Sequence, residues 1–242
     1  MHREYHRWFS PRLERDMELL EFGCGGDAVI VFPTREGRFF DYEDWGLVDA
    51  LREAIDGGRL RLFCVDSVDS EALYCRCRVP RERIARQCAY EGYVLEELVP
   101  LIRCRDAAAP LVAHGCSIGA YHAVNISFRH PELFRRVVGL SGRYDLTQPI
   151  GPFADLLDGY YDQDVYFQTP SHFIPNLTDS VVLQRLRALE ITLVVGEEDP
   201  FCDNTKRLSQ ALWDRGVPNH LTVWSGEAHR ARDWRAMVRL YL

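Results

Sequence analysis

Short apolar runs alternate with segments whose apolar residues recur every three to four positions along most of this chain. The first pattern predicts buried strands and the second predicts amphipathic helices. Strands are expected at 28–32, 59–65, 110–115, 135–142, 191–199 and 220–226. Helices are expected at 45–55, 81–105, 118–129, 205–216 and 234–242. Such alternation is typical of an α/β fold with a mostly parallel central sheet flanked by helices.

Two features modify this simple alternation. Residues 3–10 and 15–23 alternate polar and apolar positions, which predicts a pair of antiparallel N-terminal strands ahead of the buried strand at 28–32. Pro100 lies inside the long helical pattern at 81–105, so we expect a kink or an interruption there.

Residues 143–188 do not follow the alternation. This segment is rich in aromatic, Asp and Pro residues and is too long for an ordinary connection, so a lid or pocket-forming insert is expected. A surface excursion that only packs on the sheet is the alternative. The aromatic residues that could line or pack around a pocket are Tyr160, Tyr161, Tyr166, Phe167 and Phe173.

Length and charge restrict the function classes. The 242 residues suit a single α/β domain covering 1–242, and the net charge of −7 argues against nucleic-acid binding. No signal-peptide pattern and no apolar stretch of membrane-spanning length occurs, so the sequence predicts a cytoplasmic protein without a membrane partner. The sequence does not predict an oligomeric state, and a homo-oligomer remains an alternative to a monomer.

The eight cysteines are interpreted as free thiols, because the chain is long and carries no export signal. Cys75 and Cys77 are too close in sequence for the usual zinc spacing and have no paired second half. Asp158, Asp162 and Asp164 do not follow a calcium-loop pattern. We therefore expect no metal.

The strand at 110–115 runs into Gly115-Cys116-Ser117-Ile118-Gly119, and a helix follows directly. A Gly-x-Ser-x-Gly motif in this context predicts a nucleophile elbow that exposes the Ser117 hydroxyl. The Ile118 N–H would serve as one oxyanion donor. A tight turn with a capping serine is the alternative. Cys116 precedes the apex and is interpreted as a small packing residue, and His114 as a hydrogen-bonded core histidine.

A serine nucleophile needs a base and an orienting acid, which follow in the order Ser, Asp or Glu, His in this architecture. Asp199 follows a strand end and is the first choice for the acid, with Asp203 second. His229 lies between the last strand and the closing helix and is the predicted base. The loop after the strand at 28–32 should provide the second oxyanion donor, from the N–H of Thr34 or of Arg35. The Arg35 side chain could instead face a substrate carboxylate or solvent.

Several segments then resemble the putative-esterase family of α/β-hydrolases, which includes esterase D (S-formylglutathione hydrolase), enterochelin esterase and the antigen 85 mycolyltransferases. The most specific are "GCSIGAYHAVNISFRHPELF" and "LSGRYD", and "VIVFPTREG", "GEEDPFCDN" and "AHRARDW" also match. The resemblance implies an α/β-hydrolase fold with Ser117, Asp199 and His229 as the triad. Ala120 replaces a common second glycine, and "AHRARDW" replaces a His followed closely by Trp.

Together these features predict a serine esterase that hydrolyses a carboxylic ester or thioester of a small molecule through an acyl-enzyme, without a cofactor. An acyltransferase with the same triad and a non-catalytic hydrolase-like binding protein are the alternatives.

Overall fold

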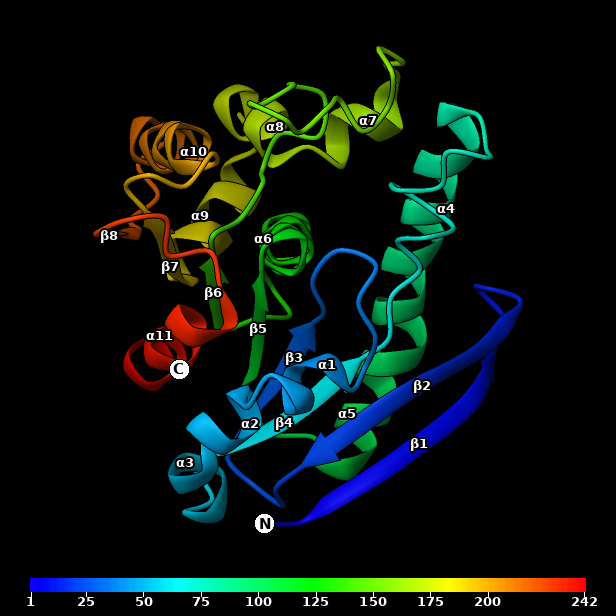
Figure 1. Ribbon diagram of the computed structural model, residues 1–242, viewed down its shortest axis with the longest axis vertical. Helices are drawn as coiled ribbons and strands as arrows, with labels where there is room; N and C mark the ends of the chain where they lie inside the picture. Colours follow the sequence, from blue (N-terminus) through cyan, green and yellow to red (C-terminus); the bar gives the residue numbers. More distant parts are fainter.

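The computed structural model describes residues 1–242 and contains one eight-stranded sheet in the order β1-β2-β4-β3-β5-β6-β7-β8 (Figure 1). The six neighbouring strands β4, β3, β5, β6, β7 and β8 run parallel to one another. β2 runs antiparallel to both of its neighbours, β1 and β4. The expected fold class and the antiparallel N-terminal pair are therefore confirmed. The strands are β1 Arg3–Ser10, β2 Arg15–Phe22, β3 Asp27–Phe32, β4 Leu60–Val65, β5 Leu111–Cys116, β6 Arg136–Leu140, β7 Glu190–Gly196 and β8 His220–Trp224.

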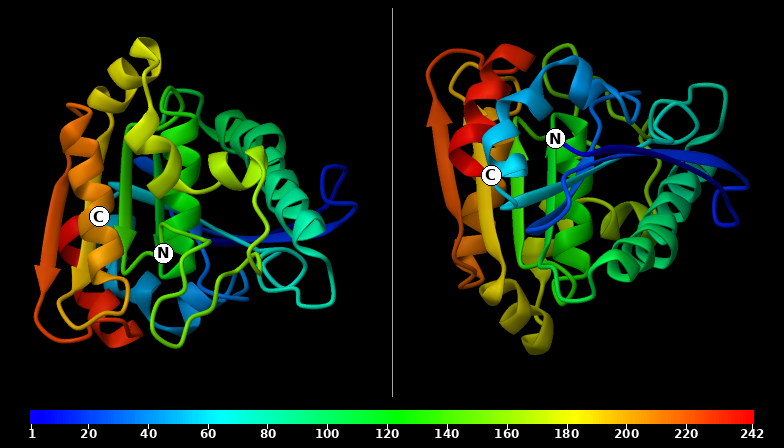
Figure 2. Two further views of the ribbon diagram at one scale, coloured as in Figure 1. Left: turned by 90° about the horizontal axis from the view of Figure 1, so that it is seen from above. Right: turned by 90° about the horizontal axis from the view of Figure 1, so that it is seen from below.

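Helices cover both faces of the sheet, as two views from opposite sides show (Figure 2). Alternate strand residues supply the two apolar cores, because successive side chains of a strand point to opposite faces. One face is covered by α1 Asp41–Asp44, α2 Leu47–Ala50, α3 Arg52–Asp56 and α11 Ala231–Tyr241. The other is covered by α4 Pro80–Tyr93, the π-helical turn η1 Val94–Leu98, α5 Val99–Arg105, α6 Ile118–Arg129, α8 Pro170–Asn176, α9 Ser180–Ala188 and α10 Cys202–Asp214.

The single helix expected at 45–55 is wrong in detail. The segment forms α2 and α3, separated at Leu51, and Gly46 precedes α2 with a φ of 72°. Leu47, Leu51 and Ile55 are spaced four residues apart and all reach the same apolar core. The apolar spacing therefore predicted the buried face correctly but not the break at Leu51.

The long pattern at 81–105 is helical but interrupted, as Pro100 predicted. The interruption is η1, which lies between α4 and α5. Pro100 has no N–H to donate to the preceding turn, and a wider turn accommodates the missing bond.

The segment 143–188 contains α7 Gln163–Phe167 in addition to α8 and α9. Asp162 caps α7 by accepting a bond from the Val165 N–H, and Asp179 caps α9 in the same way. Asp158 pairs with Arg83, so it too has a structural partner. None of the helices in the protein combines the length and apolar character needed to cross a lipid bilayer.

Candidate active site

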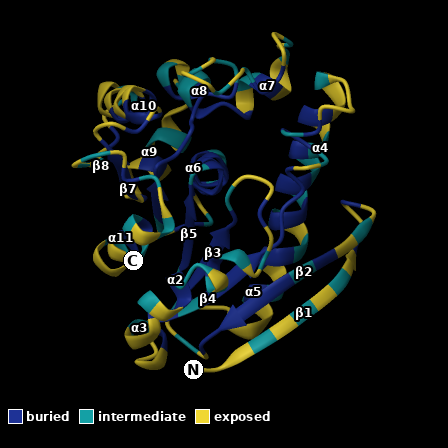
Figure 3. Ribbon diagram, viewed as in Figure 1, coloured by how far each residue is buried: buried dark blue, intermediate teal, exposed yellow.

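Ser117 lies at the junction of β5 and α6, two elements that are largely buried (Figure 3). Its backbone has φ 57° and ψ −123°, a region that residues with a side chain rarely adopt. The turn is held by the Ser117 N–H, which donates to the carbonyl of Leu140 at 2.8 Å. Ser117 itself is partly exposed although its neighbours are buried. The turn therefore presents one hydroxyl at the carboxyl end of the sheet.

Both glycines of the motif are required by close backbone approach. A Cβ on Gly115 would lie 2.8 Å from the nitrogen of Ala120 and closer still to the Gly119 carbonyl group. A Cβ on Gly119 would lie 2.5 Å from the Pro33 carbonyl oxygen and closer still to that of Phe32. Gly115 therefore permits the sharp turn into α6, and Gly119 brings the end of β3 against the elbow.

The three residues expected to form a triad lie together. The Nε2 atom of His229 is 3.0 Å from the Ser117 Oγ, and its Nδ1 atom is 2.8 Å from the Asp199 Oδ2. A carboxylate only accepts, so the Nδ1–H donates to Asp199 and leaves Nε2 as an acceptor for the serine hydroxyl. The other carboxylate oxygen of Asp199 accepts from the Phe201 N–H at 2.9 Å, and the Asp199 side chain is fully buried. This is the arrangement in which an imidazole can take a proton from a serine hydroxyl.

Aromatic side chains hold the His229 ring on two sides. The Trp234 ring lies edge-to-face with it at 5.3 Å, and the Phe201 ring is 5.9 Å away. The Trp234 Nε1–H donates to the Ser141 Oγ, which in turn donates to the carbonyl of Ala228 beside His229. Sequence reasoning missed Phe201 and Ser141. Both residues lie in segments that match the family, Ser141 in "LSGRYD" and Phe201 in "GEEDPFCDN", but the motifs do not reveal these contacts.

The rival residues have other roles. Asp203 is exposed at the start of α10 and makes no contact with His229. His114 is fully buried, and its Nδ1–H donates to the Val138 carbonyl at 2.9 Å. Burial lowers the pKa of His114 to about 4, so the ring is neutral. Cys116 is buried in an apolar core, and this burial raises the pKa of its thiol and keeps it protonated.

The backbone donors expected for an oxyanion lie at the start of α6 and in the loop that follows β3. Ile118 is the first residue of α6, so the helix offers no acceptor for its N–H. The N–H groups of Thr34 and Arg35 donate to no protein acceptor either. Their loop follows Pro33, which contacts the elbow at Gly119. All three donors are therefore free, and the geometry does not separate Thr34 from Arg35.

A cavity of about 620 Å³ is connected to this constellation through neighbouring residues, although none of Ser117, Asp199 and His229 lines it. Its wall includes Phe153, whose ring is tilted against that of Phe201 with centroids 4.9 Å apart, and Phe201 in turn contacts His229. On the other side, Leu73 and Leu156 line the cavity and pack in one apolar cluster with Ile118. The lining residues are Arg35, Glu36, Leu73, Tyr74, Arg76, Arg83, Arg143, Pro152, Phe153, Ala154, Asp155, Leu156 and Asp158.

The aromatic residues expected to line the pocket are placed elsewhere. Tyr160 donates to Asp162 beside the α7 cap, Tyr166 packs against the large core, and Phe167 is exposed beneath the guanidinium of Arg129. None of them lines the cavity. The insert does contribute to the wall, but through residues 152–158.

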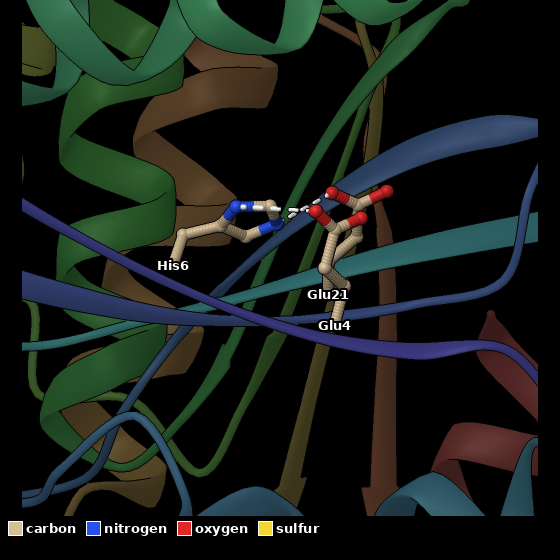
Figure 4. Close-up of side chains that lie close together, drawn as sticks. All are labelled: Glu4, His6 and Glu21. Carbon is tan, nitrogen blue, oxygen red and sulfur yellow. Dashed lines mark hydrogen bonds and ion pairs between the residues drawn. The ribbon is translucent and has the colours of Figure 1, made fainter.

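Two other features lie away from Ser117. An open depression of about 1250 Å³ lies at the amino ends of β3 and β4, at the opposite edge of the sheet from Ser117. Glu4, His6 and Glu21 present three groups with metal-ligand chemistry on β1 and β2 (Figure 4). However, the Glu21 carboxylate already accepts from Arg61 and lies 3.7 Å from Arg105. Because these guanidinium groups compensate the buried charge of Glu21, we interpret the cluster as an ion-pair network.

The family model described as "Putative esterase" matches residues 63–238, more than two thirds of the chain. A sequence comparison with curated proteins found no match. Among solved structures, a ferulic acid esterase superposes with a TM-score of 0.79 at 17% identity, covering 100% of this chain and 96% of that one. An S-formylglutathione hydrolase from Agrobacterium tumefaciens gives 0.74 at 16% identity, covering 99% and 92%.

A third similar structure is MPT51 (FbpC1) from Mycobacterium tuberculosis, with a TM-score of 0.72 at 12% identity over 98% of this chain and 96% of that one. At these identities the three structures establish the α/β-hydrolase fold. The family model covers the elbow, Asp199 and His229. The protein therefore belongs to the putative-esterase family of α/β-hydrolases and is a serine hydrolase that acts on esters.

Proposed function

We propose that the protein hydrolyses a carboxylic ester of a small molecule through an acyl-enzyme formed on Ser117. One observation carries the proposal: the unbroken chain of hydrogen bonds from the Ser117 hydroxyl through His229 to the buried Asp199. Asp199 orients the ring and stabilises the imidazolium that forms, and the aromatic contacts of Phe201 and Trp234 limit ring rotation.

In the first half-reaction His229 takes the Ser117 proton while Oγ attacks the ester carbonyl carbon. The carbonyl oxygen becomes negative and receives hydrogen bonds from the Ile118 N–H and from the loop at Thr34 and Arg35. His229 then returns the proton to the leaving alcohol, and the ester bond breaks. In the second half-reaction His229 takes a proton from water, whose oxygen attacks the acyl carbon. The bond between the acyl carbon and Oγ then breaks, His229 returns the proton to Ser117, and the acid is released.

The test is hydrolysis of a short-chain p-nitrophenyl ester by the parent protein and by Ser117→Ala. We expect kcat to fall by about 10⁴-fold or more, because the substitution removes the nucleophile. The matched control is Ser180→Ala, an exposed serine at the start of α9, which should keep the parental rate. Equal rates for Ser117→Ala and the parent would refute the proposal.

The same experiment separates the alternatives. If glycerol diverts the acyl group to a glycerol ester faster than water releases the acid, the protein is an acyltransferase. If Ser117 fails to react with a fluorophosphonate in the folded protein and no ester is hydrolysed, a non-catalytic binding role takes its place.

We also propose that the reaction takes place in the cytoplasm. All eight cysteines are free in the structure, as expected where thiols remain reduced. Recovery of the active native protein from the extracellular fraction of cells would contradict this location.

A further inference from the structure

The 620 Å³ cavity is lined by a buried arginine, Arg143, that has no carboxylate partner. Arg143 follows β6, lines the cavity and is only 2% exposed. A buried arginine is ordinarily paired with a carboxylate, because an uncompensated charge away from water is costly. Arg143 forms no ion pair within the chain, and Asp145 and Asp155 act on it only from longer range. Burial accordingly lowers the pKa of its guanidinium, although an arginine remains charged at neutral pH.

Backbone carbonyls hold this guanidinium in place without neutralising it. Nε donates to the carbonyl of Asp145 at 3.0 Å, and Nη2 donates to those of Gln148 at 3.0 Å and Ala154 at 2.8 Å. The remaining nitrogen, Nη1, makes no hydrogen bond with the protein and is not sealed from solvent. Because Arg143 borders the cavity, Nη1 is the free donor at its wall.

The carboxylates nearest to Arg143 have other hydrogen-bond or ion-pair partners. Asp145 accepts from the N–H groups of Thr147 and Gln148 and lies 3.4 Å from His172. Asp155 accepts from the N–H groups of two residues that follow it, each at 2.7 Å. Asp158, also in the cavity wall, pairs with Arg83.

A second guanidinium, that of Arg35, lines the same cavity. The Arg35 side chain lies over the Tyr74 ring at 5.2 Å, and its nearest carboxylate is the exposed Glu36 at 3.3 Å. Tyr74 also lines the cavity, and its hydroxyl has no hydrogen-bond partner in the protein. Arg76 lines the rim, exposed and without an ion pair. The cavity thus offers several unused donors and a surplus of positive charge.

We infer that this cavity binds a carboxylate of the substrate between Arg143 and Arg35, so that the preferred ester carries a negatively charged group near the scissile bond. The inference rests on the proposed ester hydrolysis at Ser117. A fixed guanidinium and a planar carboxylate form charge-assisted hydrogen bonds, which are roughly twice as strong as neutral ones. The substrate charge would complete the ion pair that the protein leaves open.

The experiment compares two matched ester pairs. The first is the p-nitrophenyl half-ester of adipic acid against its methyl-capped diester, with release of p-nitrophenolate as the readout. The second is 4-acetoxybenzoate against its methyl ester, which places the charge on the alcohol side. For the parent, at least one anionic ester should have the higher kcat/KM of its pair, by about tenfold or more.

Arg143→Gln should lower the anionic-to-neutral ratio of kcat/KM by about 10- to 100-fold, because it removes a charged donor from a buried site. Arg35→Gln keeps the backbone N–H and should lower the ratio by about two- to fivefold, because this side chain is exposed. Arg52→Gln removes a surface charge at the far edge of the sheet and should leave the ratio unchanged. A purely structural loss would lower both members of a pair together, which the ratio cancels.

Ser117-dependent hydrolysis of the neutral esters, with no preference for either anionic partner, would overturn the carboxylate site and leave the esterase intact. An unchanged ratio in both arginine variants would overturn it as well. Failure of Ser117→Ala to abolish hydrolysis of the neutral esters would instead refute the proposed function.

Discussion

Replacement of Gly119 by alanine should disable the site while the fold persists. The new Cβ would lie 2.5 Å from the Pro33 carbonyl oxygen and closer still to that of Phe32, whereas real Cβ contacts stay above 3.0 Å, so this backbone must retreat by more than about 0.5 Å. Both oxygens belong to backbone at the end of β3 and the start of the loop carrying Thr34 and Arg35, so no flexible side-chain end can give way. Overpacking of this kind costs about 1–3 kcal/mol of stability.

The catalytic effect should exceed the effect on stability. A shift of about 1 Å in a catalytic group can cost about 10²-fold in rate, so a displacement of half that size or more should lower kcat by about 10- to 100-fold. For a neutral ester KM should change less than kcat, because the shifted N–H donors act on the oxyanion of the transition state.

The assay is steady-state hydrolysis of a p-nitrophenyl ester, with circular dichroism and thermal unfolding to establish that Gly119→Ala is folded. Gly92→Ala is the matched control, since its Cβ would meet only the flexible guanidinium end of Arg12, at 3.1 Å from Nε. That variant should keep the parental kcat. A folded Gly119→Ala protein with a kcat within about twofold of the parent would refute the role assigned to this contact.

Two further predictions test the acid and the buried histidine. Asp199→Asn should lower kcat by about 10⁴-fold, because it favours the wrong tautomer of His229. Asp203→Asn should leave kcat unchanged. Comparable losses of kcat in both variants would reject the assignment of Asp199. His114 has a pKa of about 4 in the fold against 6.5 without burial, so the unfolded chain binds its proton first as the pH falls. The free energy of unfolding should therefore decrease by about 2–3 kcal/mol between pH 7.5 and 4.5 on account of this residue. Urea titrations at both pH values should show a smaller decrease for His114→Gln, and an undiminished decrease would contradict the prediction.

The elements that sequence patterns predicted best are those whose burial follows directly from local periodicity. The helix expected at 118–129 has those bounds in α6, because the elbow defines its start and an apolar pattern continues to its end. The segment 45–55 forms two short helices that meet at Leu51, although its four-residue apolar spacing continues through both. Local periodicity therefore predicted the buried face of this segment but not its division.

Around the site, the sequence alone determined the candidate nucleophile, the order of its partners and the neighbourhood of the oxyanion loop, since strand ends of a parallel sheet meet at one edge. Only the tertiary structure decided between Asp199 and Asp203, because their separation along the chain is four residues and only one reaches His229. The tertiary structure also showed that residues 152–158 line the cavity, whereas Tyr160, Tyr166 and Phe167 do not. It further showed that Arg143 has no carboxylate as an ion-pair partner. These outcomes depend on side-chain direction and long-range packing, which a linear pattern of polar and apolar residues does not encode.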